Sequence, residues 1–369
     1  MTLHHVRVAV VTESFLPQVN GVTNSVLRVL DHLDDTGHEA VVVAPGPGPA
    51  SYGRTPVVRV PSSPLPLYAE QRLAWPGPEL SRALRAFRPD VVHLAAPAVL
   101  GAQAAPPARA LGVPVVAVYQ TDLPGYAARY RVPALSRAAW SWVRRVHAPA
   151  ARTLAPSRHA CEQLRTHGVH RVSRWPHGVD PYRFSPGHRD DDLHRRLAPQ
   201  GEVLVGYVGR LAPEKELGLL AAVQRLPGVR LVIAGDGPQR AALRRQLPRA
   251  RFLGMLGGQE LSALFASLDV FVHTGRHETF CQAALEALAS GVPVVAPAAG
   301  GLLDLVEPGV NGELFAPGAA GEVRRLVQEL AEDPVRRRRM AAAARASVAG
   351  RGWGAIGDEL LRTYRSVLS

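Results

Sequence analysis

The sequence has little cysteine and no long apolar run. Only Cys161 and Cys281 occur among 369 residues, so a disulfide scaffold is excluded and a reducing cytosol is the simplest setting. Neither cysteine lies in a Cys-X-X-Cys pair or a Cys/His cluster of ligand spacing, so we expect no metal site. No run of 18 apolar residues exists, which excludes a membrane-spanning helix.

The N-terminus lacks a long apolar segment followed by a small-residue cleavage site, so we expect a cytoplasmic protein. Lys and Arg number 43 against 31 Asp and Glu, which gives a formal net charge of +12. This balance favours an anionic partner: a nucleotide, a nucleic acid or a membrane surface. The sequence has no zinc finger and no basic strand interleaved with aromatics, so we expect no nucleic-acid partner.

Lysine is almost absent. Lys215 is the only lysine, and every other basic side chain apart from histidine is arginine. An ammonium is a compact point charge, whereas a guanidinium is a flat fork. Either this lysine is a chance survivor, or it contacts a phosphate at a place where arginine does not fit.

The first half of the chain alternates between strand and helix patterns. Short apolar runs without polar alternation are typical of parallel strands covered on both faces. Their alternation with amphipathic helices predicts a doubly wound α/β sheet. We expect strands at 6–11, 40–44, 57–60, 91–95, 113–119, 152–155 and 172–175, and helices at 22–33, 79–87 and 134–146.

The second half repeats this scheme, so the predicted fold is two Rossmann-like doubly wound domains facing a cleft. The segment 175–187 is rich in proline and glycine and is the expected hinge. We assign residues 1–178 to one domain and 179–352 to the other, and we expect a last helix at 353–369. We expect strands at 203–208, 230–234, 251–252, 270–273, 292–296 and 313–315, and helices at 214–225, 239–246, 260–266, 279–289 and 320–331.

Ligands of such sheets bind beyond the carboxyl ends of the strands. After the first strand, Gly21 precedes a helix, where the backbone can approach an anion closely. This is either a ligand contact or a plain turn. Arg210 and Lys215 flank a turn that opens a helix in the second half. Two cations beside a helix N-terminus suit a diphosphate, unless both are only solvated surface charges.

The most informative segment runs from residue 277 to 286. Eight residues of helix rise about 12 Å, so Glu278 and Glu286 would lie on nearly one face. That spacing would let them contact the two ends of a sugar nucleotide, because carboxylates accept hydrogen bonds from vicinal hydroxyls. We expect backbone amides to point at a phosphate where this helix begins. The residues concerned are Thr279, Phe280, Cys281 and Gln282.

Together these motifs resemble the retaining GT-B glycosyltransferases of family 4, over nearly the whole chain. The amino-acid sequences of residues 278–282 and 119–122 are most similar to those of GDP-mannose-dependent α-mannosyltransferases acting on glycolipids. The resemblance implies that Arg210 and Lys215 bind the donor diphosphate, that Glu278 binds hexose hydroxyls and that Glu286 binds the ribose. It implies no cofactor and no metal, and a last helix that crosses back to the first domain. On this resemblance, Arg210, Lys215 and Glu278 are the predicted catalytic residues.

At two places in the first domain, the sequence departs from the pattern of the family that it resembles. Asn20 precedes Gly21 where relatives show paired glycines, and relatives place a histidine near Gln120. We therefore assign Gln120 and Asp122 only as contacts of the donor sugar or the acceptor. Tyr68 and Arg72 are predicted to hold an anionic acceptor head group.

The helix at 134–146 combines arginine and tryptophan, a mixture that suits an anionic membrane surface. Trp140 and Val143 could equally be core residues, with the arginines in water. A peripheral location on the inner face of the cell membrane follows from the first interpretation.

The predicted function is mannose transfer from GDP-mannose to a lipid-linked or polyol acceptor. A UDP-sugar transferase is one alternative. Pockets for guanine and for uracil are both formed mostly by backbone atoms, so the side chains in the sequence do not distinguish the two donors. A nucleotide-binding regulatory protein without turnover is another, and the set Arg210, Lys215, Glu278 and Glu286 argues against it.

Overall fold

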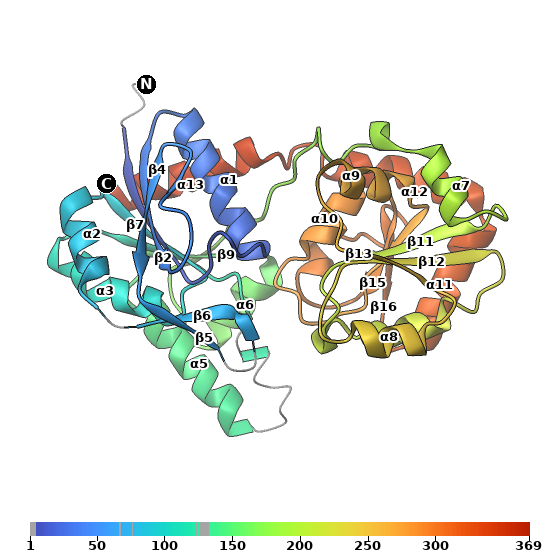
Figure 1. The fold of residues 1–369 in the computed structure, drawn as a ribbon, viewed down its shortest axis with the longest axis horizontal. Coiled ribbons are helices and arrows are strands. Elements are labelled where there is room, and N and C mark those ends of the chain that lie inside the picture. The colour runs from blue at the N-terminus through green and yellow to red at the C-terminus, as the bar shows by residue number, and fades with distance from the viewer. Residues whose placement is uncertain (1–4, 66–67, 76, 123, 126–132) are drawn as a thin grey trace. The chain divides into compact units, whose positions relative to one another are not determined.

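The computed structural model describes residues 5–65, 68–75, 77–122, 124–125 and 133–369. It divides the chain into two compact units (Figure 1). The first unit combines Met1–His177 with Trp353–Ser369, and the second is Gly178–Gly352. Each is an α/β unit with a parallel sheet, so the predicted fold class is confirmed. In the described part of the chain, no helix has the length and apolar character needed to cross a membrane.

The sheet of the first unit has the order β10-β9-β8-β7-β1-β2-β4-β3. All its pairings are parallel except that of β3 with β4. Its strands are β1 (Arg7–Thr12), β2 (Glu39–Pro45), β3 (Ser51–Tyr52), β4 (Thr55–Val60), β7 (Val91–Ala95), β8 (Val115–Val118), β9 (Arg152–Ala155) and β10 (Val172–Arg174). A separate hairpin consists of β5 (Ser62–Leu65) and β6 (Tyr68–Ala74).

Alternate residues of each strand enter two different cores. Val8 and Val10 of β1 pack into one cluster, and Ala9 and Val11 into another. Both faces of this sheet are therefore covered, which explains the unbroken apolar runs in the sequence. The covering helices are α1 (Gly21–Asp35), α2 (Glu79–Phe87), α3 (Leu100–Ala110), α5 (Pro133–His147), α6 (Arg158–Thr166) and α13 (Trp353–Leu368).

The last helix, α13, packs against α1 in the first unit. Tyr364 of α13 is fully buried, and its hydroxyl lies 2.7 Å from Nδ1 of His93 on β7. The indole of Trp175 donates to the Ile356 carbonyl at 2.9 Å. These contacts join residues far apart in the sequence, so the two ends of the chain share one core.

The sheet of the second unit is parallel and has the order β13-β12-β11-β14-β15-β16. Its strands are β11 (Val203–Val208), β12 (Val229–Ala234), β13 (Arg251–Gly254), β14 (Val270–Val272), β15 (Val294–Pro297) and β16 (Gly312–Phe315). Its helices are α7 (Asp191–Leu197), α8 (Arg240–Gln246), α9 (Gly258–Ser267), α10 (Gln282–Ala289), α11 (Ala320–Glu332) and α12 (Pro334–Ser347). Short 3-10 turns are η1 (Pro186–His188), η2 (Pro213–Lys215), η3 (Leu217–Ala222) and η4 (Gly300–Asp304).

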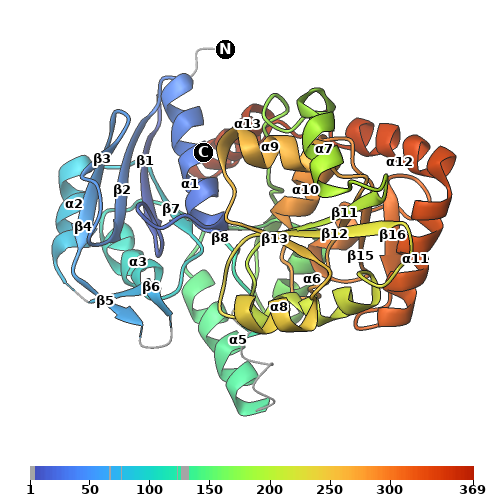
Figure 2. The same ribbon diagram turned by 45° about the vertical axis from the view of Figure 1, so that its right-hand side comes forward.

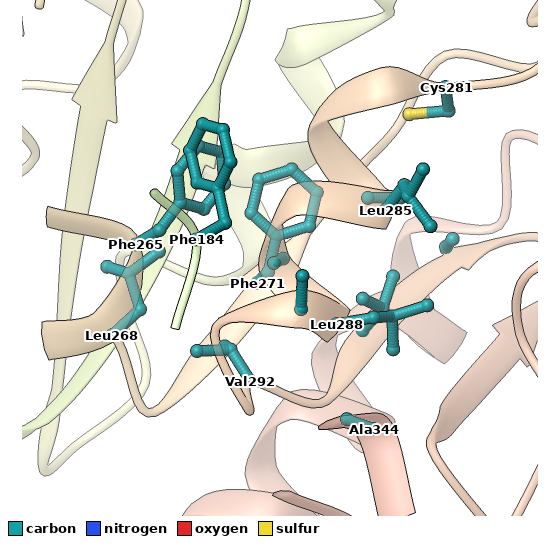
Figure 3. Packing of buried hydrophobic residues seen from close by; sticks show 14 of the residues in the cluster. Phe184, Phe265, Leu268, Phe271, Cys281, Leu285, Leu288, Val292 and Ala344 are labelled. Carbon is teal, nitrogen blue, oxygen red and sulfur yellow. The ribbon is translucent and has the colours of Figure 1, made fainter. Parts of the chain in front are cut away.

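Helices α7, α9 and α10 lie on one side of this sheet and α8 on the other (Figure 2). Phe271 of β14 points into the first of these two cores, where Figure 3 shows it beside Phe265 and Phe184. Val270 and Val272 enter the opposite core. Cys281 lies at the edge of the first core, near Leu285.

Two predicted helices differ from the structure, and the helices α3, α6 and α7 were not predicted. Residues 214–225 do not form an α-helix but 3-10 turns, because Glu216 adopts a left-handed φ of 50° and is held by Arg276. The predicted helix 279–289 begins only at Gln282, because Cys281 has a φ of 83°, outside the helical region. Helix α3 was missed, since Pro106 and Pro107 lie inside it.

Candidate active site

Strand order in the second unit brings together the segments that the sequence singled out. β11 has β12 on one side and β14 on the other, so its connections leave in opposite directions. Such a switch point opens a crevice at the carboxyl ends of the strands. The turn 209–215 follows β11 and the segment 273–281 follows β14. Lys215 and Glu278 thus reach one place.

Three charged side chains meet there. Lys215 donates from Nζ to Oε1 of Glu278. Nε2 of His273 lies 3.0 Å from the same oxygen. The side chains of Lys215 and Glu278 are 20% and 14% exposed, whereas His273 is 2% exposed. The site therefore reaches solvent through the lysine and the carboxylate, with the histidine beneath them.

The pKa values in this cluster show that its side chains stabilise one another's charged forms against the effect of burial. Burial raises the pKa of Glu278, but Lys215 and His273 together outweigh burial and hold that pKa at about 2. Burial lowers the pKa of Lys215, and Glu278 raises it well above the ordinary value. For His273, burial lowers the pKa, whereas Cys281 and Glu278 raise it to about 9. Lys215 thus keeps its positive charge at neutral pH, and this ammonium on the solvent-facing side of the cluster suits an anionic ligand.

The segment after β14 contacts the turn that carries Lys215 and holds it in place. The hydroxyl of Thr274 donates to the Lys215 carbonyl at 2.6 Å. Arg276 binds both carboxylate oxygens of Glu216, at 2.6 and 2.9 Å. At Gly275 a Cβ would lie 3.1 Å from the Lys215 Cα. These contacts hold Lys215 in a defined position, although the predicted helix after the turn is not formed.

Arg210 lies on the same turn after β11 as Lys215 and is exposed. Gly235 has a φ of 130°, and a Cβ there would lie 1.9 Å from the Gly209 carbonyl oxygen. Tyr207 donates its hydroxyl to the Arg210 carbonyl at 3.1 Å, and its ring stacks on His273. The turn after β12 thus supports the backbone of the turn that carries Arg210.

A second glycine pair supports Glu278. Gly301 donates its amide to the Glu278 carbonyl at 2.8 Å. A Cβ at Gly300 would lie 2.3 Å from that same oxygen, and Gly300 has a φ of 58°. The start of η4 is therefore packed against the backbone of the site, and a larger residue would displace Glu278.

The prediction that Glu278 and Glu286 share one helix face is wrong. Glu286 lies on α10, but Glu278 precedes that helix in an irregular segment. Lys215 draws the first carboxylate to the turn after β11, and the left-handed Cys281 prevents the helix from extending back to it. Gln282 lies 3.4 Å from the Glu286 carboxylate and also donates to the Gly178 carbonyl at 3.1 Å.

The segment between them is mostly buried. Phe280 is 2% exposed and Cys281 is 6% exposed, and both belong to the hydrophobic core. Any contact of Phe280 with a donor would therefore come from its backbone. Thr279 is only partly buried. Sequence reasoning missed His273 as a site residue, although its place at the end of a buried strand was a signal.

In the first unit, Gly21 begins α1, and the Asn20 side chain caps that helix by accepting from the Thr23 amide at 3.0 Å. No atom of the described chain lies within 4 Å of a Cβ built on Gly21. Packing inside the unit therefore gives no reason for glycine at this position. A role in ligand approach stays a prediction.

The other residues proposed as ligand contacts in this unit, where the structure describes their side chains, form hydrogen bonds to neighbouring residues or are partly buried. Asp122 accepts from the Tyr119 hydroxyl at 3.0 Å and from the Gly125 amide at 2.9 Å. Gln120, which precedes it after β8, is partly buried. Arg72 donates to the hydroxyl and the carbonyl of Ser62 within its own hairpin, at 2.9 and 3.0 Å. The side chain of Tyr68 lies outside the described residues.

Two doubly wound parallel sheets, with charged side chains at a strand switch point, are the architecture of GT-B glycosyltransferases. A solved structure of Anabaena HepE in complex with UDP and glucose has this fold, with a TM-score of 0.80. The superposition covers 98% of this chain and 100% of that one, at 21% sequence identity. The protein therefore has the GT-B fold.

Sequence comparison narrows the class to a family. The description Glycosyltransferase Family 4 matches residues 19–183, and Glycosyl transferases group 1 matches residues 189–347. A GDP-mannose-dependent alpha-mannosyltransferase of Mycobacterium tuberculosis is 51% identical over 98% of this chain and 97% of its own length. Another protein of that species, a GDP-mannose-dependent alpha-(1-6)-phosphatidylinositol dimannoside mannosyltransferase, is 29% identical over 93% of this chain and 92% of its own length. The chain belongs to glycosyltransferase family 4.

Proposed function

We propose that this chain transfers mannose from GDP-mannose to a glycolipid or polyol acceptor, with retention of configuration. The observation that carries the proposal is the cluster of Lys215, Glu278 and His273, with its charged ammonium, at the switch point of the second sheet. The relative with 51% identity is named for GDP-mannose, which favours this donor over a UDP-sugar. The relative with 29% identity is named for a glycolipid acceptor.

In this proposal the second unit holds the donor. Lys215 and Arg210 bind the diphosphate, and their hydrogen bonds strengthen as negative charge develops on the leaving group. Glu278 accepts from mannose hydroxyls, and Glu286 from the ribose. The first unit presents the acceptor, with Gly21 against the donor and with Gln120 or Asp122 near the sugar.

Retention would follow from attack on the face that the diphosphate leaves. The acceptor oxygen forms the new bond to the anomeric carbon, while the bond from that carbon to the phosphate oxygen breaks. The acceptor proton passes to a departing phosphate oxygen, so the proposal assigns no side chain as base. Cationic stabilisation of the diphosphate is then the main contribution of the protein.

A thermal-shift comparison of GDP, UDP and ADP tests the donor. Because a ligand that binds the native state raises apparent stability by mass action, GDP and GDP-mannose should raise Tm most. The comparison is run with EDTA throughout, since this reaction is proposed to need no metal. A larger shift with UDP would overturn the donor assignment, and loss of turnover in EDTA would overturn the metal-free mechanism.

Slow hydrolysis of GDP-mannose without acceptor separates this enzyme from a nucleotide-binding regulatory protein. Release of mannose by the wild type, and its loss in Arg210→Ala, is the expected result. Arg210 is exposed, so this variant should fold normally. Binding of GDP-mannose with no release of mannose under any acceptor condition would favour the regulatory alternative.

The acceptor is proposed to come from an anionic membrane surface, through α5. Trp142 is 38% exposed, and the Arg145 guanidinium lies 6.0 Å from its ring centre. Arg144 is exposed as well. Trp140, by contrast, stacks on His167 with ring centres 3.7 Å apart, and Val143 is buried. Half of the predicted patch is thus core, and the other half is a basic aromatic surface.

Vesicle sedimentation tests this surface. Anionic vesicles should bind the protein at low salt more than neutral vesicles do, and each arginine near the surface should contribute about 1 kcal/mol. Reversing Arg144 and Arg145 to Glu should abolish binding and leave GDP affinity unchanged. Arg88→Glu is the matched control, since Arg88 is also exposed in this unit but follows α2. Equal binding to neutral vesicles would place the acceptor in solution.

A further inference from the structure

Three different metal-ligating groups meet beneath Lys215. An imidazole nitrogen of His273, a carboxylate oxygen of Glu278 and Sγ of Cys281 lie within 4.8 Å of one another. Nε2 of His273 and Oε1 of Glu278 are 3.0 Å apart. Two of the residues come from the segment after β14, and the third immediately precedes α10 and belongs to the hydrophobic core.

The spacing fits a tetrahedral metal. Ligand bonds of about 2.0–2.3 Å place nitrogen, oxygen and sulfur about 3.3–3.6 Å apart around Zn²⁺. A thiolate and an imidazole select borderline or soft ions such as Zn²⁺, Co²⁺ and Cd²⁺, whereas Mg²⁺ and Ca²⁺ need sets of oxygens. Three protein ligands leave a fourth position for water or an incoming group.

The members of the cluster are buried and contact one another. His273 is 2% exposed, its Nε2 lies 3.0 Å from Oε1 of Glu278, and Cys281 and Glu278 both raise its pKa. Cys281 adopts a φ of 83°, a conformation rare for any residue but glycine. A strained backbone that places a thiol beside a buried imidazole is typical of a functional site.

We propose that His273, Glu278 and Cys281 bind one soft divalent cation, Zn²⁺ in particular, and that this cation competes with Lys215 for the Glu278 carboxylate. Binding forms metal bonds to nitrogen, oxygen and sulfur. It releases the thiol proton, and any proton on the imidazole, to the solvent. The exposed fractions of Lys215 and Glu278 place the entry route on their side of the cluster. The site is thus a place for inhibition by soft metals and not a catalytic metal centre.

Cobalt spectroscopy of the whole protein tests the site without reference to activity. Co²⁺ titrated into the metal-free protein should give a near-ultraviolet band from thiolate-to-cobalt charge transfer and strong visible bands of tetrahedral cobalt. Saturation should come at one equivalent, and Zn²⁺ should abolish the bands. Absence of the charge-transfer band would overturn the proposal.

Variants identify the ligands. Cys281→Gly should remove the charge-transfer band, and it suits the left-handed backbone, so the protein should stay folded. His273→Gln should weaken Co²⁺ binding at least tenfold. Cys161→Ala is the matched control, because Cys161 is the other buried thiol and lies in the first unit. A band that survives Cys281→Gly, or disappears in Cys161→Ala, would overturn the assignment.

A competition experiment links the metal site to the proposed function, on which this last step rests. If Glu278 binds the donor sugar, saturating GDP-mannose should weaken Co²⁺ binding at least tenfold. Zn²⁺ should inhibit the wild type, EDTA should reverse the inhibition, and Cys281→Gly should lose it. A cobalt site that forms as described but ignores GDP-mannose supports the metal site and contradicts the donor role of Glu278.

Discussion

The two units have the same doubly wound architecture but bury titratable groups in opposite states. In the first unit, burial lowers the pKa of His93 and of His147 to about 4, so both rings are neutral at physiological pH. In the second unit, His273 and Lys215 are held charged around Glu278. His273 is as deeply buried as His93 and His147, so burial alone does not explain the difference.

Charged neighbours explain it, because burial lowers the pKa of His93 and of His147, whereas Cys281 and Glu278 outweigh burial and raise that of His273. His93 lies inside β7, where its ring meets Tyr364 of α13 and joins two elements of a core. His273 follows the last residue of β14, where the sheet ends and connections diverge. A buried ion pair is weak evidence for stability, because desolvation offsets most of the attraction. The comparison teaches that charge retained at a strand end marks a site, whereas a neutral histidine within a strand belongs to the scaffold.

The largest expected effect concerns Lys215. Lys215→Ala should raise the activation barrier of mannose transfer by about 2–4 kcal/mol, because it removes a charge-assisted contact with the leaving diphosphate. Single-turnover kinetics at saturating GDP-mannose measures this barrier. Lys215→Arg keeps the charge and is the matched variant, and it should recover only part of the rate. Wild-type turnover by a folded Lys215→Ala would contradict the assignment of the second unit.

A comparable effect is expected on the stability of the first unit in acid. An unfolded histidine takes up a proton near pH 6.5, whereas folded His93 and His147 take one up only near pH 4. Stability should therefore fall as the pH drops from 6.5 towards 4, by at most about 3 kcal/mol for each group. All five tryptophans lie in the first unit, so tryptophan fluorescence during urea unfolding reports on this unit.

The matched variants for this acid effect are His93→Asn and His170→Asn, because His170 is an exposed residue of the same unit. The pH slope should become shallower in His93→Asn and stay unchanged in His170→Asn. An unfolding free energy that does not vary between pH 6.5 and 4.5 would show that the buried rings are not neutral.

A smaller effect should separate the two carboxylates of the second unit. Glu286→Gln should weaken GDP binding by about 1.5–3 kcal/mol, because it removes a charged acceptor for the ribose. Glu278→Gln should leave GDP affinity closer to that of the wild type and impair mannose transfer. Calorimetric titration with GDP alone, followed by turnover, measures both. Equal loss of GDP affinity in the two variants would mean that the carboxylates do not divide the donor.

The smallest expected effect contrasts two glycines. Gly21→Ala faces open space at the start of α1, so stability should change by no more than about 1 kcal/mol while the KM for GDP-mannose rises. Gly300→Ala meets the Glu278 carbonyl and requires a left-handed alanine, so both stability and turnover should fall. Thermal unfolding with and without GDP-mannose distinguishes them. An unchanged KM in Gly21→Ala would remove this residue from the donor site.

Much of the fold could be predicted from the sequence, because its signals are local. Parallel strands covered on both faces appear as short apolar runs, and β7, β9 and β11 have the predicted bounds. The amphipathic pattern of 353–368 predicted α13 equally well. The resemblance of residues 278–282 to a known family was sufficient to predict the class of enzyme, since such motifs are continuous stretches of sequence.

Where long-range contacts overrule local preference, the sequence was a poor guide. Glu216 has a good helical sequence around it, yet its ion pair with Arg276 and its left-handed backbone interrupt the predicted helix. Glu278 lies in a pattern that reads as one helix with Glu286, yet Lys215 holds it outside α10. Each of these partners lies about 60 residues away along the chain.

The sequence by itself determined the two α/β units, the charged residues at their turns and the family. Periodicity and short motifs are properties of neighbouring residues and need no folded partner. Only the tertiary structure decided that Lys215, His273, Glu278 and Cys281 form one cluster. The order of strands in a sheet, which no local pattern encodes, brings the ends of β11 and β14 side by side. The pKa of each group in the cluster then depends on neighbours that only this arrangement supplies.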